Sequence, residues 1–152
     1  MQPTQTTNDT YLGFDFGTKK IGVAVGHSET QTSSPLVTIK SLNDRPNWEK
    51  IGQIINLWQP YGLIIGISKQ QDGSDNPVTP LMVKFCRQLE GRFHLPAYQI
   101  DETLTTFEAK QILFDDLKTS ATKLWAIQDQ LAAQLILQTW LNHHALKNHE
   151  RK

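Results

Sequence analysis

The sequence predicts an α/β domain in which a mixed, five-stranded sheet carries helices on both faces. Three strand-like segments separated by short turns come first, which is typical of an antiparallel start. Apolar segments of strand length then alternate with segments of helical periodicity, which is the pattern of strand-helix-strand crossovers. The 152 residues are enough for a single domain with a full hydrophobic core.

The antiparallel start is predicted by alternation of apolar side chains. In residues 11–16, Leu12, Phe14 and Phe16 alternate with Tyr11, Gly13 and Asp15, which is the period of a strand. A tight Gly17-Thr18 turn leads to the next apolar segment, so the first two strands should form a hairpin. The three strands are expected at 11–16, 21–25 and 35–39.

The remaining elements follow from helical stripes, caps and short apolar runs. Ile51, Ile55 and Trp58 share one helix face, and Pro60 marks the stop. Helices are expected at 48–58, 79–90, 105–114 and 127–146, and strands at 62–67 and 97–100. Cys86 falls on the inner face of its helix, where we interpret it as a core residue.

Composition limits the functional classes. Fifteen basic and fifteen acidic residues cancel, so a nucleic-acid partner must be held by local patches or metal ions. A single cysteine excludes an intramolecular disulfide and Cys-rich zinc sites. We expect a cytoplasmic domain over 11–142, a disordered tail over 1–10 and a polar tail over 143–152 that contains three histidines.

Three acidic positions are candidates for chemistry. Asp15 lies near the carboxyl end of the first strand, and Asp101-Glu102 follow the last strand. If these strands are parallel neighbours, their acids meet in the crevice where open α/β sheets bind ligands. Asp129, expected in the first turn of the last helix, falls on the apolar face that must pack against the sheet.

Such a cluster would need a cation. Two carboxylates about 4 Å apart repel by about 4 kcal/mol at an effective dielectric constant of 20. Oxygen ligands alone favour Mg²⁺ or Mn²⁺ over zinc, and two such ions suit phosphodiester hydrolysis. Each acid also has an ordinary structural interpretation: Asp15 as an Asx turn, Glu102 as a solvated strand end, and Asp129 as a helix-capping residue.

Four ordered motifs resemble the YqgF/RuvX family. They are L-G-F-D-F-G-T-K-K-I-G-V-A-V from Leu12, I-I-G-I from Ile64 with Asp72-Gly73 after it, D-E-T-L-T-T-F-E-A from Asp101, and D-Q-L-A-A-Q-L-I-L from Asp129. The likeness extends from about Tyr11 to Leu141. Members of this bacterial family are described as Holliday junction resolvases and as nucleases that mature the 5′ end of 16S ribosomal RNA.

The resemblance implies a ribonuclease H-like fold and a two-metal nuclease. It places Asp15, Glu102 and Asp129 at the catalytic, metal-binding positions, with Asp101 orienting Glu102. We therefore expect a precursor of 16S ribosomal RNA as substrate, with four-way DNA as the alternative. The sequence predicts no particular oligomeric state.

The chain departs from the family pattern at the substrate contacts. Thr103 replaces an arginine that could hold a phosphate with two hydrogen bonds. We expect Lys19, Lys20, Lys69 and Ser68 to contact the nucleic-acid backbone, although each could be an ordinary surface residue. Trp125 is either a base-stacking platform or a core residue.

Two other functions compete with the nuclease. The D-x-G-T segment also resembles the phosphate-binding hairpin of actin-like and Hsp70-like ATPases, but those folds need two such subdomains and this chain has room for one. A catalytically silent RNA-binding factor for ribosome assembly is the other alternative. Three clustered acids disfavour it, because repelling carboxylates destabilise a pure binding module.

Overall fold

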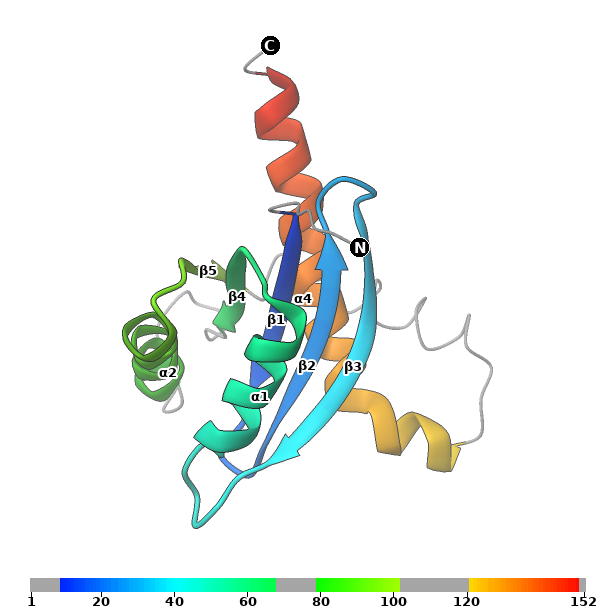
Figure 1. Cartoon of the computed structure of the whole chain (residues 1–152). Coiled ribbons are helices and arrows are strands. Elements are labelled where there is room, and N and C mark those ends of the chain that lie inside the picture. Colours follow the sequence, from blue (N-terminus) through cyan, green and yellow to red (C-terminus); the bar gives the residue numbers. More distant parts are fainter. Residues whose placement is uncertain (1–8, 68–78, 102–120, 151–152) are drawn as a thin grey trace.

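The computed structural model of the chain contains one mixed five-stranded sheet between two layers of helices (Figure 1). It describes residues 9–67, 79–101 and 121–150, and only the backbone of 121–128 and 145–150. The elements are β1 (Thr10–Phe16), β2 (Lys20–His27), β3 (Thr32–Lys40), α1 (Trp48–Trp58), β4 (Gly62–Ile67), α2 (Thr79–Phe93), β5 (Ala97–Asp101) and α4 (Ala121–Glu150).

The strand order is β3-β2-β1-β4-β5. The pairs β1–β2 and β2–β3 are antiparallel, whereas β1–β4 and β4–β5 are parallel, which confirms the predicted antiparallel start and parallel crossovers. The expectation that the first and last strands are neighbours is wrong, because β4 lies between them. β4 is buried along its whole length and so needs a partner on both edges, whereas Tyr98 and Gln99 of β5 are exposed, as suits an edge strand.

The two faces of β1 serve two separate parts of the core. Leu12 and Phe14 pack with residues of α1 and α2, including Ile51, Phe85 and Leu89. Tyr11 belongs to a second cluster with α4 residues such as Ala133, Ile136 and Leu137. The period-2 alternation of the sequence therefore separates an α1/α2 face of the sheet from an α4 face.

Glycines on the α4 face allow the helix backbone to touch the sheet. A Cβ atom added to Gly13 would lie 2.7 Å from Cβ of Leu137, and one added to Gly26 would lie 3.0 Å from Cδ2 of the same leucine. At Gly22 the added atom would overlap the carbonyl oxygen of Asp129. These three positions have no room for a side chain, so the segment of α4 from Asp129 to Leu141 lies directly against the sheet.

Helix α4 is longer than the sequence predicts. It spans Ala121–Glu150, whereas the expected range was 127–146, because no Gly or Pro interrupts the segment. Asp129 therefore lies in the helix interior and not in the first turn, and a role in capping the helix is ruled out. Residues 143–150, expected to be a polar tail, belong to the same helix.

An aromatic cluster joins α4 to the sheet near the amino-terminal ends of β1 and β5. The rings of Trp140 and His144 stack with centroids 4.6 Å apart, and Trp140 also stacks on Tyr98 of β5. The ring centroids of Tyr11 and Trp140 are 4.8 Å apart. The pKa of Tyr11 is raised, mainly because its side chain is buried. His144 thus contributes to packing and is not a solvated tail residue.

The other element boundaries agree closely with the predictions. α1 and β4 have the expected bounds, and the side chain of Asn47 accepts a hydrogen bond from the backbone N–H of Lys50 at the start of α1. β3 begins three residues earlier than expected and carries Pro35 at a register shift of an edge strand, where proline is tolerated. The helix expected at 105–114 lies outside the described residues. Within the described ranges, no helix has the length and apolar character needed to cross a bilayer.

The close approach at Gly22 predicts a large effect of a single methyl group. Gly22→Ala is expected to lower the free energy of unfolding by about 3 kcal/mol, because α4 must move away from β2. Urea denaturation measures this change. Gly91→Ala is the matched control, since its added Cβ meets nothing within 4 Å and should stabilise α2 by about 0.5–1 kcal/mol. Equal effects of the two variants would contradict the packing described above.

Burial of Cys86 predicts that its thiol reacts slowly with alkylating reagents. The side chain is 4% exposed, and burial raises the pKa of its thiol. Iodoacetamide near neutral pH should therefore alkylate the native protein at least about tenfold more slowly than the urea-unfolded chain, as followed by mass spectrometry. Since the folded-state pKa is the higher one, stability should be full below the ordinary thiol pKa and fall as the pH rises above it. Equal alkylation rates would refute the assignment of Cys86 to the core.

Candidate active site at the carboxyl end of β1

Gly22 brings two of the predicted acids together. Asp15 is the register partner of Gly22 in the β1–β2 hairpin, and directly opposed Cβ atoms lie about 4.5–5.5 Å apart. A Cβ on Gly22 would lie 2.9 Å from Cβ of Asp129. The Cβ atoms of Asp15 and Asp129 are therefore at most about 8 Å apart, close enough for one cation to bind both carboxylates.

Both acids lie on the α4 face of the sheet. Asp15 continues the alternation of Tyr11 and Gly13, which face α4, and Asp129 projects from α4 itself. Both side chains are partly buried. The sequence pattern identified this face for each acid, but only the glycine contact explains how close the two elements come.

A lysine supplies the local positive charge. Nζ of Lys20, at the start of β2, lies 3.0 Å from Oδ2 of Asp129, with side chains 49% and 23% exposed. Two neighbouring carboxylates repel each other, and this ammonium group offsets part of that repulsion. The expectation that Lys20 contacts phosphate remains a prediction, and the structure adds a carboxylate partner for it.

Lys19 points to a different partner. Its Nζ lies 2.6 Å from Oδ1 of Asp44, and both side chains are largely exposed. Such an exposed ion pair contributes little to stability and can open when a ligand arrives. The adjacent lysines of the hairpin turn thus occupy two separate places, one beside Asp129 and one beside the loop that precedes α1.

The third acidic segment is described only in part. Asp101 ends β5 and pairs with Ile67, while its neighbour Ile100 packs on the α4 side. Alternation therefore turns Asp101 to the opposite face, away from Asp15 and Asp129. Glu102, Ser68, Lys69 and Thr103 lie outside the described residues, as does the side chain of Trp125.

The donor chemistry of the acidic pair fits a hard divalent cation. The donors are carboxylate oxygens, which are the ligands that such cations prefer. The ammonium group of Lys20 already contacts Asp129, so a positive charge is accommodated beside this carboxylate. Among the residues that the structure describes, no three His, Cys, Asp or Glu side chains come close enough to hold a metal. Asp15 and Asp129 would therefore need a third ligand from outside these ranges.

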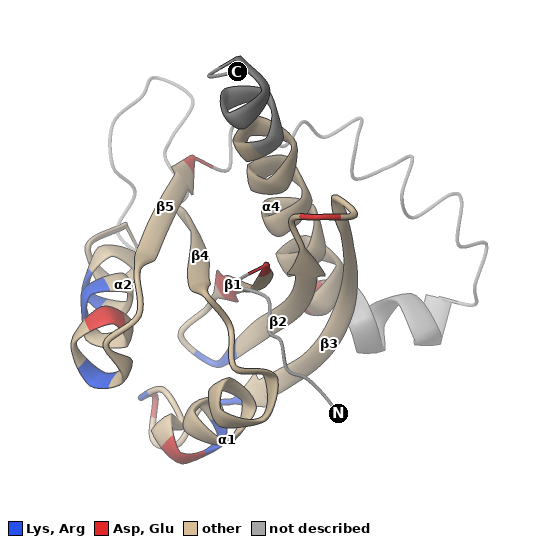
Figure 2. Ribbon diagram, turned by 45° about the horizontal axis from the view of Figure 1, so that its top comes forward, with Lys and Arg blue, Asp and Glu red and all other residues tan. Residues whose placement is uncertain are grey.

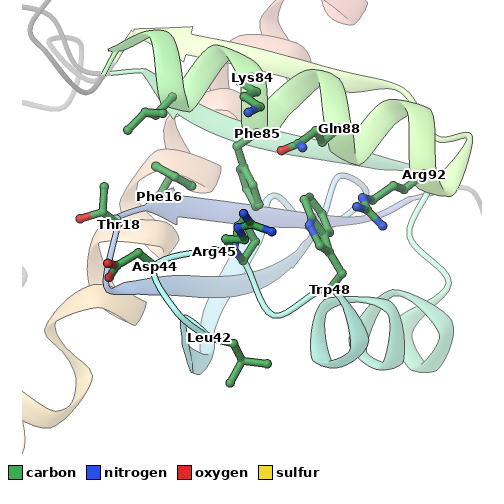
Figure 3. A pocket seen from close by; sticks show the side chains of 12 residues that line it. Phe16, Thr18, Leu42, Asp44, Arg45, Trp48, Lys84, Phe85, Gln88 and Arg92 are labelled. Atoms are coloured by element: carbon green, nitrogen blue, oxygen red, sulfur yellow. The ribbon is translucent and has the colours of Figure 1, made fainter.

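A groove lies on the α1/α2 face of the sheet, the face opposite to the acidic pair (Figure 3). It has a volume of about 530 Å³, and Phe16, the residue after Asp15, contributes to its wall. The other lining residues are Thr18, Leu42, Asp44, Arg45, Pro46, Trp48, Leu81, Lys84, Phe85, Gln88 and Arg92. Sequence reasoning missed this groove, although Lys84, Gln88 and Arg92 recur at four-residue spacing along one face of α2.

Sequence comparison relates the chain to known nucleases. Residues 9–143 match the RuvX family, which is described as Holliday junction resolvase. A protein of Methylococcus capsulatus with the provisional name pre-16S rRNA nuclease is 47% identical over 92% of this chain and 93% of its own length. A protein of Nitrosomonas europaea with the same provisional name is 42% identical over 93% of this chain and 97% of its own.

Structural comparison identifies the fold. The fowlpox virus Holliday junction resolvase superposes with a TM-score of 0.52 over 88% of this chain and 98% of that chain, at 16% sequence identity. Its complex with substrate Holliday junction DNA gives a TM-score of 0.51 at 18% identity. The predicted ribonuclease H-like fold is thereby confirmed.

The Lys20–Asp129 contact predicts competition between an ammonium group and a divalent cation. Lys20→Gln is expected to tighten Mg²⁺ binding about fivefold, the equivalent of about 1 kcal/mol for a partly exposed pair. Isothermal titration calorimetry measures the affinity. Lys19→Gln removes a neighbouring charge that is bound to Asp44 and should leave the Mg²⁺ affinity unchanged. An equal change of the Mg²⁺ affinity in both variants would contradict direct competition at Asp129, because it would show that any nearby positive charge has the same effect.

Proposed function

This chain belongs to the RuvX family and is a nuclease, and we propose that it hydrolyses the precursor of 16S ribosomal RNA at its 5′ end. The observation that carries the proposal is the approach of Asp129 to Asp15 over Gly22. The provisional names of relatives at 42–47% identity support the choice of ribosomal RNA as substrate. The proposal includes a cytoplasmic location, where precursor ribosomal RNA is processed.

Asp15, Glu102 and Asp129 would hold two Mg²⁺ or Mn²⁺ ions. Bound ions of this kind activate a water molecule and stabilise the leaving oxygen of a phosphodiester. Asp15 is well suited to this role, because its backbone pairs with Gly22 of β2 and the preceding residue, Phe14, is paired with strands on both sides. Asp101 would orient Glu102 from the adjoining position.

Lys20 would position the substrate. Its ammonium group is held beside the acidic pair by Asp129 and is still half exposed, so it can meet a phosphate oxygen at the site. Lys19, Lys69 and Ser68 are the further backbone contacts in the proposal. Contacts of this kind are independent of base sequence, so substrate choice must come from RNA shape or other surfaces.

Four-way DNA is the second candidate substrate. The family description names Holliday junction resolvase, and the fold is shared with a viral resolvase. Metal-assisted hydrolysis of a phosphodiester proceeds at the phosphate and so is compatible with both RNA and DNA. Direct comparison of the two substrates is therefore needed.

Cleavage assays with acid variants test the proposal. The purified protein is incubated with a precursor 16S rRNA fragment, and separately with a DNA junction, in Mg²⁺, Mn²⁺ or EDTA. We expect metal-dependent cleavage of the RNA, and a loss of at least about 100-fold in Asp15→Asn, Glu102→Gln and Asp129→Asn, because each removes a metal ligand. Substrate binding should persist in all three variants.

Glu29→Gln is the matched control, because Glu29 is an exposed acid in the turn between β2 and β3. This turn follows the carboxyl end of β2, whereas Lys20 and Gly22 lie at its amino end. The control variant should cleave like the unmodified protein. Cleavage of the junction alone would replace RNA by DNA as the substrate. Binding without cleavage of either substrate would favour a silent RNA-binding factor.

A further inference from the structure

The groove on the α1/α2 face has a cationic rim. Arg45 comes from the loop before α1, and Lys84 and Arg92 come from α2 on the opposite wall (Figure 3). All three side chains are exposed, and within the described part of the chain none of them forms an ion pair with a carboxylate. The one acid of the lining, Asp44, is bound by Lys19. The groove therefore carries a local positive charge on a chain of zero net charge.

Basic side chains gather on this face of the molecule. Figure 2 shows them on α2, on α1 and in the loop before α1, whereas α4 shows none in its described side chains. Between Asp129 and His144, the part of α4 whose side chains are described, no Lys or Arg occurs. Among the described side chains, a polyanion therefore meets more positive charge on the α1/α2 side than along α4.

Aromatic rings form the floor of the groove. Trp48 stacks on Phe85 with centroids 5.6 Å apart, and Phe85 lies 5.0 Å from the ring of Phe16. Trp48 and Phe16 are partly exposed. Arg92 extends over Trp48, with its Cζ 4.3 Å from the ring centroid, so the guanidinium group is held at the wall without a carboxylate partner among the described residues.

The groove and the acidic pair lie on opposite faces of the sheet, at the same end of β1. Phe16 lines the groove and Asp15 turns to the α4 face, and their Cα atoms are about 3.8 Å apart. Thr18, in the following turn, also belongs to the lining. A strand that lies in the groove can therefore pass around the carboxyl end of β1 and present a phosphate to Asp15.

We propose that this groove binds the single-stranded RNA segment that flanks the scissile phosphate. The proposal rests on the proposed nuclease function and adds a substrate-binding surface to it. Arg45, Lys84 and Arg92 bind successive phosphates, and the partly exposed rings of Phe16 and Trp48 pack against the unpaired bases. A cationic track beside aromatic rings that are at least partly exposed is a combination by which proteins hold unpaired strands.

The shape of the groove selects an unpaired strand over a duplex. A volume of about 530 Å³ accommodates one or two nucleotides, whereas a base-paired helix can reach only the rim. Contact with the bases requires that they be unstacked from a partner strand. RNA ends and loops meet this condition.

Binding measured without metal tests the proposal separately from catalysis. A fluorescent single-stranded RNA of about 12 nucleotides is titrated with the full chain in EDTA at several salt concentrations, and its anisotropy is recorded. The variants are Arg45→Gln, Lys84→Gln, Arg92→Gln and their triple combination. Each single variant should weaken binding about fivefold at 0.1 M salt and reduce the slope of log K against log salt by about 0.7, and the triple variant should reduce the slope by about 2.

Arg87→Gln is the matched control, since Arg87 is an exposed cation of the same helix that does not line the groove. It should leave the salt slope unchanged. An unchanged slope in the triple variant, or the same change in the control, would overturn the proposal. So would a blunt RNA duplex bound as tightly as the single strand, or AMP that competes at the affinity of the oligonucleotide.

The two proposals fail in different ways. If the unmodified protein binds the oligonucleotide with a groove-dependent slope but cleaves nothing, the groove assignment stands and the nuclease assignment fails. If the triple variant binds and cleaves RNA like the unmodified protein, the nuclease assignment stands and the groove is overturned. Asp15→Asn should bind like the unmodified protein, because Asp15 lies on the other face of the sheet.

Discussion

The contact between α4 and β2 at Gly22 determines the geometry of the site. A helix normally rests on side chains of a sheet, but here the backbone of α4 reaches the backbone of β2 because Gly22 has no side chain. Gly22 is also the register partner of Asp15. One small residue thus sets the separation of two carboxylates that come from segments far apart in the sequence.

The two faces of the sheet carry different features of the candidate site. The α4 face carries the acidic pair and is lined by glycines of the sheet and by alanine and aliphatic side chains of α4. The α1/α2 face carries the aromatic and cationic groove. Because successive residues of a strand point to opposite faces, Asp15 and Phe16 connect the two surfaces at the end of β1. A substrate strand can then be bound on one side and cut at the edge.

Local charge placement compensates for a neutral chain. The acidic pair would repel a phosphate backbone, but Lys20 is bound directly to Asp129 and Lys19 lies in the same turn. Three further cations line the neighbouring groove. In the proposed function, attraction to nucleic acid is therefore a property of one region, so the net charge alone carries little information about the partner.

The sequence by itself determined the elements and the faces of this protein. Alternation in β1, the helical stripe of α1 and the apolar run of β4 predicted their bounds, because these periods reflect burial that local segments must satisfy. They also assigned Asp15 to one face of a strand and Asp129 to the apolar face of a helix. Only the tertiary structure decided that β4 separates β1 from β5, that α4 starts as early as Ala121, and that α2 and the loop before α1 enclose a groove. These features depend on contacts between segments that are far apart in the sequence. The hydrophobic periodicity of one segment does not indicate which other segments it will contact.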